Sequence, residues 1–201
     1  VPMDQLIIRV NSRDKDLLNA SLASIDSRQL EIDTMPDKYY QHKIGMNNVF
    51  GRNFNIAIKN SVDGTIADVG NIIVLEKDGF PHCVEVALGS STILKQIFNL
   101  DHVQDCHPLP CLNHSNKTWV RKFEDTVILS MHLMHEGLTP SNKDNRTRIL
   151  KKYLDSMKRI KSMLQLDDNF FANYLQSFES DEFEGGSNEL SQAILDYISS
   201  K

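Results

Sequence analysis

Two apolar segments joined by a tight turn, in residues 66–88, constrain the fold of this chain more than any other feature. Both segments are rich in Ile and Val, which favour strands. Between them, Lys77-Asp78-Gly79 has the composition of a hairpin turn. The pattern therefore predicts a β-hairpin. Asp68 precedes the first strand and Glu85 lies within the second. We expect the chain to build a sheet around this hairpin.

The hydrophobic pattern elsewhere predicts further strands and helices around the hairpin. Strands are expected at 5–10, 31–35, 54–58 and 126–133. Helices are expected at 12–30, 90–100, in a long segment after Asp144, and at 169–178 and 188–199. This order predicts an α/β or α+β fold, with a mixed central sheet flanked by helices and a small C-terminal helical region. We expect one domain over residues 1–165 and a helical tail over 166–201.

The composition indicates a reducing compartment. No apolar run approaches the roughly 20 residues that cross a bilayer, and we see no secretory leader. Cys83, Cys106 and Cys111 are odd in number, and one of them falls inside an expected strand. That pattern favours free thiols over a disulfide framework. We therefore expect a nuclear or cytoplasmic protein.

The charge is unevenly distributed. The formal net charge of −5 argues against indiscriminate binding to nucleic acid, yet residues 143–161 hold eight of the 22 Lys and Arg residues. Several basic residues on one helix face can follow a phosphate backbone without reading sequence. We predict such contacts for Arg148, Lys151, Lys152, Lys158 and Arg159. The alternative is a lysine-rich face that contacts only water.

The two acids of the hairpin suggest a metal site. Carboxylates from neighbouring strands can hold Mg²⁺ or Mn²⁺ against a phosphodiester. In an active enzyme Asp68 and Glu85 would bind the ion, and Lys95 on the next helix would complete the catalytic set. His42 would be a further metal ligand and would favour Mn²⁺. The alternative is that Asp68 caps a turn and Glu85 faces solvent.

A loop over residues 101–118 is rich in zinc-type ligands. The candidates are His102, Cys106, His107, Cys111 and His114. Zinc sites usually take four such ligands in spaced pairs. This spacing matches no standard module, so an ordinary surface loop is favoured. His132 and His135 beside Glu136 have the wrong order for a metalloprotease helix, and that segment is expected to be a strand.

The hairpin carries a family resemblance. The run Asp68-Val-Gly-Asn-Ile-Ile-Val, the turn, Cys83-Val-Glu-Val and a helix near Ser90 resemble the XPF-type nuclease superfamily, which has a PD-(D/E)xK-like fold. That family carries Gly-Asp before one strand and Glu-Arg-Lys in the next. The matching positions here are Gly70-Asn71 and Glu85-Val86-Ala87. Asn71 replaces the aspartate and Ala87 replaces the lysine, so the resemblance implies a catalytically degenerate member.

The resemblance covers residues 60–100 and, more weakly, 165–201, and it implies a function. Non-catalytic members of the family pair with a related subunit, and many end in tandem helix-hairpin-helix motifs. The tail with Glu184-Gly-Gly-Ser187 resembles a degenerate form of that motif. The implied protein binds branched or junction DNA as half of a heterodimer in recombination or repair, without a cofactor. The segment 101–142 departs from the family pattern, which has more core strands there.

Two other functions remain open. The chain also resembles the cap-snatching endonuclease domains of viral polymerases, on the positions His42, Asp68, Glu85 and Lys95. That resemblance implies an active Mn²⁺-dependent endonuclease. The third alternative is a protein–protein interaction module without a role in nucleic-acid binding.

Overall fold

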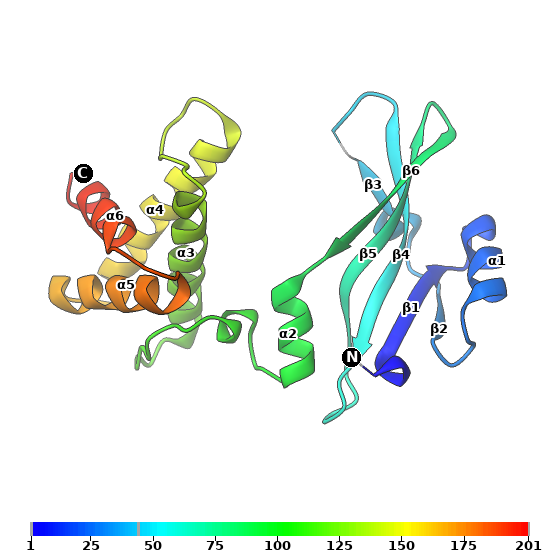
Figure 1. Ribbon diagram of the computed structural model, residues 1–201, viewed down its shortest axis with the longest axis horizontal. Coiled ribbons are helices and arrows are strands. Elements are labelled where there is room, and N and C mark those ends of the chain that lie inside the picture. The colour runs from blue at the N-terminus through cyan, green and yellow to red at the C-terminus, as the bar shows by residue number, and fades with distance from the viewer. Residues whose placement is uncertain (1, 44, 201) are drawn as a thin grey trace. The chain divides into compact units, whose positions relative to one another are not determined.

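The computed structural model describes residues 2–43 and 45–200, which form two compact units (Figure 1). The units divide between Val103 and Gln104. The domain boundary expected after residue 165 falls inside the second unit, between two of its helices. In the described chain, no helix combines the length and the apolar character needed to cross a membrane.

The first unit is built on a mixed sheet whose strands run in the order β2-β1-β4-β5-β6, with β3 paired to β4. The strands are β1 (Leu6–Asn11), β2 (Leu30–Asp33), β3 (Gln41–Lys43), β4 (Val49–Lys59), β5 (Ile66–Lys77) and β6 (Phe80–Leu88). β1 and β2 are parallel and are joined by α1 (Lys15–Ser24), whereas the other neighbours are antiparallel. The helix expected over 12–30 is therefore shorter, because the chain becomes extended at Ile25.

The predicted hairpin is confirmed, and its turn sets the register of the last two strands. Asp78 and Gly79 both have positive φ, 52° and 83°, as a two-residue type I′ turn requires. Lys77 consequently pairs with Phe80. After β6, α2 (Ser90–Phe98) packs on β4 and β5. The buried Gln96 side chain holds it there by donating to the carbonyl oxygens of Ile58 and Thr65.

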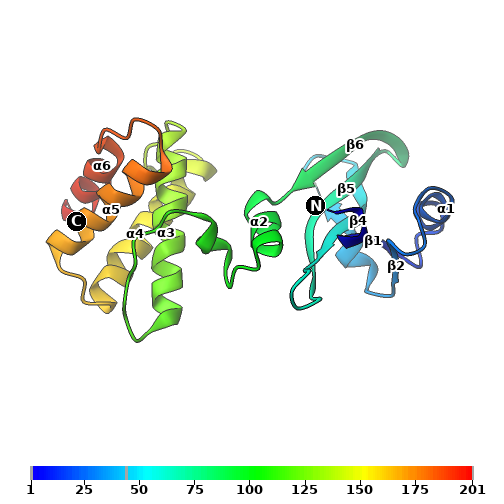
Figure 2. The same ribbon diagram turned by 60° about the horizontal axis from the view of Figure 1, so that its bottom comes forward.

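The second unit is helical (Figures 1 and 2). Over 104–200 the described chain forms the four helices α3 (Lys117–His135), α4 (Asn145–Met163), α5 (Asp168–Glu182) and α6 (Glu189–Ser199). The mixed sheet with helices, followed by a helical region, is the fold class expected from the sequence. The three predicted helices after Asp144 are also confirmed.

The strand predicted over 126–133 is wrong, because these residues lie inside α3. The β-branched run from Thr126 to Ile128 has the local character of a strand. The longer spacing is helical: Phe123, Val127 and Met131 are four residues apart and are all completely buried. Burial of this stripe in the helical core outweighs the local preference.

One continuous apolar core holds the second unit together. Its most buried members are Phe123, Val127, Met131, Leu150, Leu154, Met157, Ile160, Phe171, Leu175, Phe178 and Ile194. They come from all four helices, so each helix contributes an apolar stripe. The polar face of α4 is thereby turned outward.

Candidate functional site

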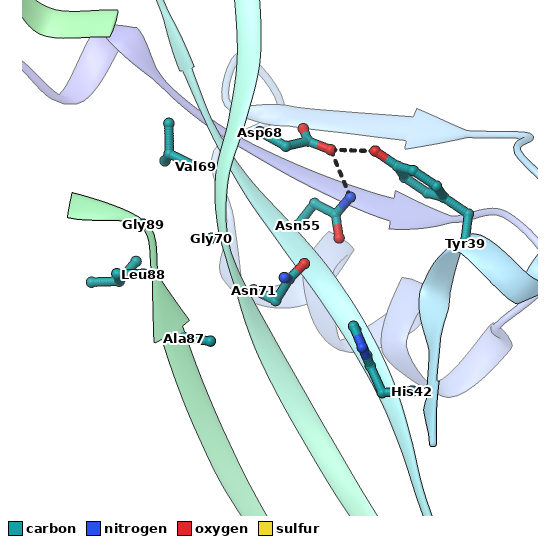
Figure 3. Close-up of a pocket in the computed structure, with 10 residues that line it drawn as sticks. All are labelled: Tyr39, His42, Asn55, Asp68, Val69, Gly70, Asn71, Ala87, Leu88 and Gly89. Carbon is teal, nitrogen blue, oxygen red and sulfur yellow. Dashed lines mark hydrogen bonds between the residues drawn. The ribbon is translucent and has the colours of Figure 1, made fainter. Parts of the chain in front are cut away.

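The first unit has a pocket of about 500 Å³ beside the last two strands (Figure 3). It is lined by Tyr39, His42, Asn55, Asp68, Val69, Gly70, Asn71, Ala87, Leu88 and Gly89. The pocket thus brings together His42 and Asp68, two of the predicted metal ligands. It also contains Asn71 and Ala87, the positions at which the sequence departs from the nuclease pattern.

Asn71 and Ala87 lie opposite one another as Cα partners in the β5–β6 ladder. Residues directly opposite in a ladder project to the same face of a sheet, so both side chains reach this pocket. The neighbouring Gly70 lets the strands approach closely. A Cβ atom at Gly70 would lie 2.4 Å from the carbonyl oxygen of Ala87, so a larger residue would displace β6.

Asp68 is the centre of a hydrogen-bond network. Its Oδ1 accepts from the Arg9 guanidinium at 2.7 Å, and its Oδ2 accepts from the Tyr39 hydroxyl at 2.6 Å and from Asn55 Nδ2 at 2.8 Å. A β-bulge opposite Ile56 and Ala57 turns the carboxylate toward these donors. Both carboxylate oxygens thus already accept hydrogen bonds, and Arg9 is shared with Glu31, so Asp68 serves as a structural anchor rather than as an open metal ligand.

Glu85 does not reach Asp68. It pairs with Ile73, five residues along β5 from Asp68, which corresponds to roughly 17 Å along the strand. Its side chain is exposed. Two carboxylates at that separation cannot share one ion, because Mg²⁺ and Mn²⁺ ligands lie about 2 Å from the metal.

Lys95 lies beside the turn at 60–65. The backbone amide and hydroxyl of Thr65 lower the pKa of Asp63, and the charge of Lys95 adds to this effect. Lys95 is not among the residues that line the pocket. His42 does line it, and its Nε2 is buried without a hydrogen-bond partner in the described chain. The structure therefore does not assemble His42, Asp68, Glu85 and Lys95 into one site.

The five basic residues predicted to contact nucleic acid all lie on α4, but they differ in availability. The Lys158 ammonium donates to the carbonyl oxygen of Ile198 at 2.8 Å, at the end of α6. The Lys151 ammonium donates to Asn142 Oδ1 at 3.1 Å. These two lysines are therefore engaged within the helical unit.

Arg148, Lys152 and Arg159 form an exposed row, here called the basic stripe. Their spacing of four and then seven residues places them on one helix face, opposite the buried Leu150 and Met157. Arg148 donates to Asn145 on its own helix at 2.8 Å. Within the described chain, Lys152 and Arg159 have no ion pair or hydrogen-bonded side-chain partner. The stripe can therefore meet an external anion.

The α5–α6 hairpin is organised by a residue that the sequence analysis missed. Glu179 is only 2% exposed. Its carboxylate accepts from the Leu190 amide at 3.2 Å, and from the amide and hydroxyl of Ser191 at 2.7 and 2.5 Å. The N-terminus of a helix is a natural anion site, and Glu179 already fills it. This hairpin therefore does not offer the α6 amides to a phosphate group. A glutamate on the apolar face of α5 was the available signal.

The loop rich in His and Cys does not close on itself as a zinc module. None of the three cysteines, all within the described residues, forms a disulfide. His114 Nδ1 instead accepts from the amide of Asn116 at 3.0 Å. His107 Nδ1 instead lies 3.0 Å from Glu182 Oε1, and its ring lies beside that of His132, with centroids 5.6 Å apart. The sequence analysis had set His132 aside, and it had not considered Glu182.

No protein family matches this chain, and no curated protein is detectably similar to it in sequence. The fold is a mixed sheet followed by a helical region. The side chains of the two units are therefore the guide to function.

Proposed function

We propose that this protein is a non-catalytic subunit of the XPF-type nuclease superfamily. It binds DNA, of branched or junction form, as half of a heterodimer in recombination or repair. The observation that carries the proposal is the pairing of Asn71 with Ala87 beside one pocket.

The pairing supports the proposal because a nuclease of this type needs its acid and its lysine at a common site. Asn71 and Ala87 occupy the two corresponding positions of the sequence pattern and project toward the same pocket. Glu85 lies two residues before Ala87 and shares its face of β6. The three positions therefore lie on one face of the β5–β6 hairpin, but the neutral amide of Asn71 and the methyl group of Ala87 supply neither negative charge for a metal nor positive charge for a phosphate.

The basic stripe supports DNA as the ligand. Three cations on one exposed helix face can each neutralise a phosphate and release a counterion. The acidic net charge of −5 makes such a localised surface necessary, because the chain as a whole would repel a polyanion. The row lacks aromatic side chains for stacking on bases, so recognition of DNA shape is more consistent with it than reading of sequence.

The edge of the sheet supports a protein partner. β6 ends the strand order, and no described strand pairs with its outer side. Val84, Val86 and Leu88 lie on one face of β6 and are 59–62% exposed. Open edges and contiguous exposed apolar side chains mark interaction surfaces. A related subunit that covers β6 would pair with its open edge and bury its exposed apolar side chains.

Fluorescence anisotropy with a labelled four-way junction and a matched duplex tests the DNA contact. We expect Arg148→Glu, Lys152→Glu and Arg159→Glu together to weaken binding at least tenfold. The slope of log affinity against log salt should fall by about 2.7, since each phosphate contact contributes about 0.9. The control reverses the exposed Lys38, Lys59 and Lys77 of the first unit, with the same change in net charge.

The comparison between the two triple variants decides the origin of any affinity. Equal losses would attribute binding to net charge and remove the basic stripe from the interface. Absence of binding to either DNA at low salt would favour an interaction module without a nucleic-acid role.

A further inference from the structure

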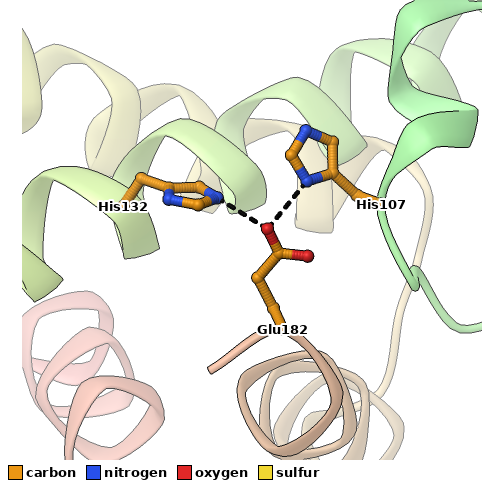
Figure 4. Close-up of side chains that lie close together, drawn as sticks. All are labelled: His107, His132 and Glu182. Atoms are coloured by element: carbon orange, nitrogen blue, oxygen red, sulfur yellow. Dashed lines mark hydrogen bonds and ion pairs between the residues drawn. The ribbon is translucent and has the colours of Figure 1, made fainter. Parts of the chain in front are cut away.

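We propose that His107, His132 and Glu182 form a binding site for a divalent transition-metal ion of the zinc class. His107 Nδ1 and His132 Nε2 each lie 3.0 Å from Glu182 Oε1 (Figure 4). The three ligand atoms all lie within 4.8 Å of one another. This inference is independent of the DNA-binding proposal, because it concerns different residues and a different ligand.

The convergence comes from three separate segments. His107 lies in the loop that precedes α3, His132 lies near the end of α3, and Glu182 is the last residue of α5. Figure 4 shows both imidazole rings directed at the same carboxylate oxygen. Such an arrangement is preorganised, because the helices rather than a flexible loop fix two of the three side chains.

Side-chain rotation can bring the three ligand atoms to the spacing of a metal site. In a tetrahedral zinc site with bonds of about 2.0–2.2 Å, neighbouring ligand atoms lie about 3.3–3.6 Å apart. The two N···O separations here, 3.0 Å, need to open by only a few tenths of an ångström. The two nitrogens lie within 4.8 Å of one another, and rotation of the imidazoles can bring them to the same spacing. Each neutral imidazole must turn its lone pair toward the ion, which requires a change of tautomer but no change of fold.

The donor set selects the class of ion. Two imidazole nitrogens and one carboxylate oxygen suit Zn²⁺, Co²⁺ or Ni²⁺, whereas Mg²⁺ and Ca²⁺ prefer oxygen ligands alone. The three side chains are 19%, 42% and 15% exposed. An ion can therefore enter from solvent, and a water molecule can take the fourth position.

Aromatic side chains hold the two imidazoles in place. The His107 ring packs edge-on against Phe178, with centroids 6.4 Å apart, and the His132 ring packs against Phe183 at 5.0 Å. Phe178 is completely buried. Phe178 lies one turn before Glu182 on α5, and Phe183 follows Glu182 directly in sequence. The apolar shell and the carboxylate are therefore positioned together. An apolar shell of this kind strengthens the ion–ligand interaction.

Calorimetric titration of Zn²⁺ into the whole chain tests the site, together with Co²⁺ absorption spectra. We expect one site of micromolar or tighter affinity and the intense visible bands of four-coordinate Co²⁺. His132→Gln keeps a side-chain donor toward Glu182, and Glu182→Gln keeps the size of that side chain. Each variant should weaken binding at least tenfold. His135→Ala is the matched control, since His135 stacks on Phe183 at 4.5 Å outside the cluster, and it should bind as the wild type does.

Circular dichroism of each variant establishes that the helical unit is folded before the titration is interpreted. Binding that persists in folded His132→Gln and Glu182→Gln would assign the ion to other residues and overturn the proposal. Absence of Zn²⁺ binding by the wild type would likewise overturn the proposal. The three side chains would then serve only to join the loop, α3 and α5 by hydrogen bonds.

Discussion

Asn71 and Ala87 face one another across the β5–β6 ladder, and both line the pocket that Asp68 borders. A nuclease of the resembled type would have an acid and a lysine there. The pocket of about 500 Å³ has room for the longer lysine side chain. The two positions can therefore be tested by restoring the missing charges.

We expect Asn71→Asp combined with Ala87→Lys to create an additional Mn²⁺ site that the wild type does not have. The new carboxylate would lie on the face that Glu85 shares, so the two acids could approach one ion. Calorimetry against the wild type measures the added site, with submillimolar affinity expected. Adding Glu85→Ala to the double variant should abolish it. An additional site that survives this third substitution would refute the proposed geometry.

Asp68→Ala should destabilise the first unit by about 2–4 kcal/mol. The substitution removes three hydrogen bonds and leaves Arg9, whose side chain is 20% exposed, with Glu31 as its remaining partner. Urea unfolding followed by circular dichroism measures the loss. Glu85→Ala is the control and should change stability by less than about 0.5 kcal/mol, because Glu85 is exposed. Equal losses in both variants would contradict the assignment of Asp68 as the anchor.

Glu179→Ala should destabilise the helical unit by about 2–4 kcal/mol. The buried carboxylate satisfies two amides at the start of α6 and the Ser191 hydroxyl, and its removal leaves buried donors unpaired. The same unfolding experiment on Glu184→Ala, an exposed acid in the adjoining loop, should give a change close to zero. A stable Glu179→Ala protein would mean that the α6 amides find other acceptors.

The stability of the helical unit should respond to the ionisation of Glu124. Burial raises the pKa of Glu124, although the hydrogen bond from Arg121 partly opposes this. Because the folded state favours the protonated acid, ionisation costs stability at neutral pH. That cost disappears as the pH falls below the ordinary carboxyl range. Glu124→Gln should therefore be at least as stable as the wild type at pH 7, with a difference that shrinks toward pH 4. Melting temperatures across that range provide the measurement. A difference that grows on acidification would reverse the sign and contradict the prediction.

Much of the fold follows from local pattern, but the site depends on register. Asp78-Gly79 and its flanking Ile and Val residues predict the hairpin correctly. The same two-residue turn already implies that Glu85 lies near Ile73 and far from Asp68, and this signal was overlooked. The helix α3 was not predicted because the eight residues from Thr126 to Leu133 have the local character of a strand. The helical spacing of the buried residues becomes clear only over the full 19 residues of α3.

Other features could not be predicted from local pattern. His107 and Glu182 are separated by 75 residues, and His132 and Glu182 by 50. No spacing rule connects residues at such distances, because they meet only when α3, α5 and the loop before α3 pack together. The ion pair between Arg9 and Asp68 likewise depends on the pairing of β1 with β4. These two strands are far apart in the sequence of the first unit.

The most direct test of the central claim measures binding and cleavage in the same samples. The wild-type protein is incubated with a labelled four-way junction in Mg²⁺ or Mn²⁺, bound fraction is read by anisotropy, and the DNA is then separated on a denaturing gel. We expect salt-sensitive binding with intact DNA in both metals. Cleavage that disappears in Glu85→Ala would contradict a non-catalytic subunit and support an active nuclease, and an unbound junction at low salt would contradict DNA binding itself.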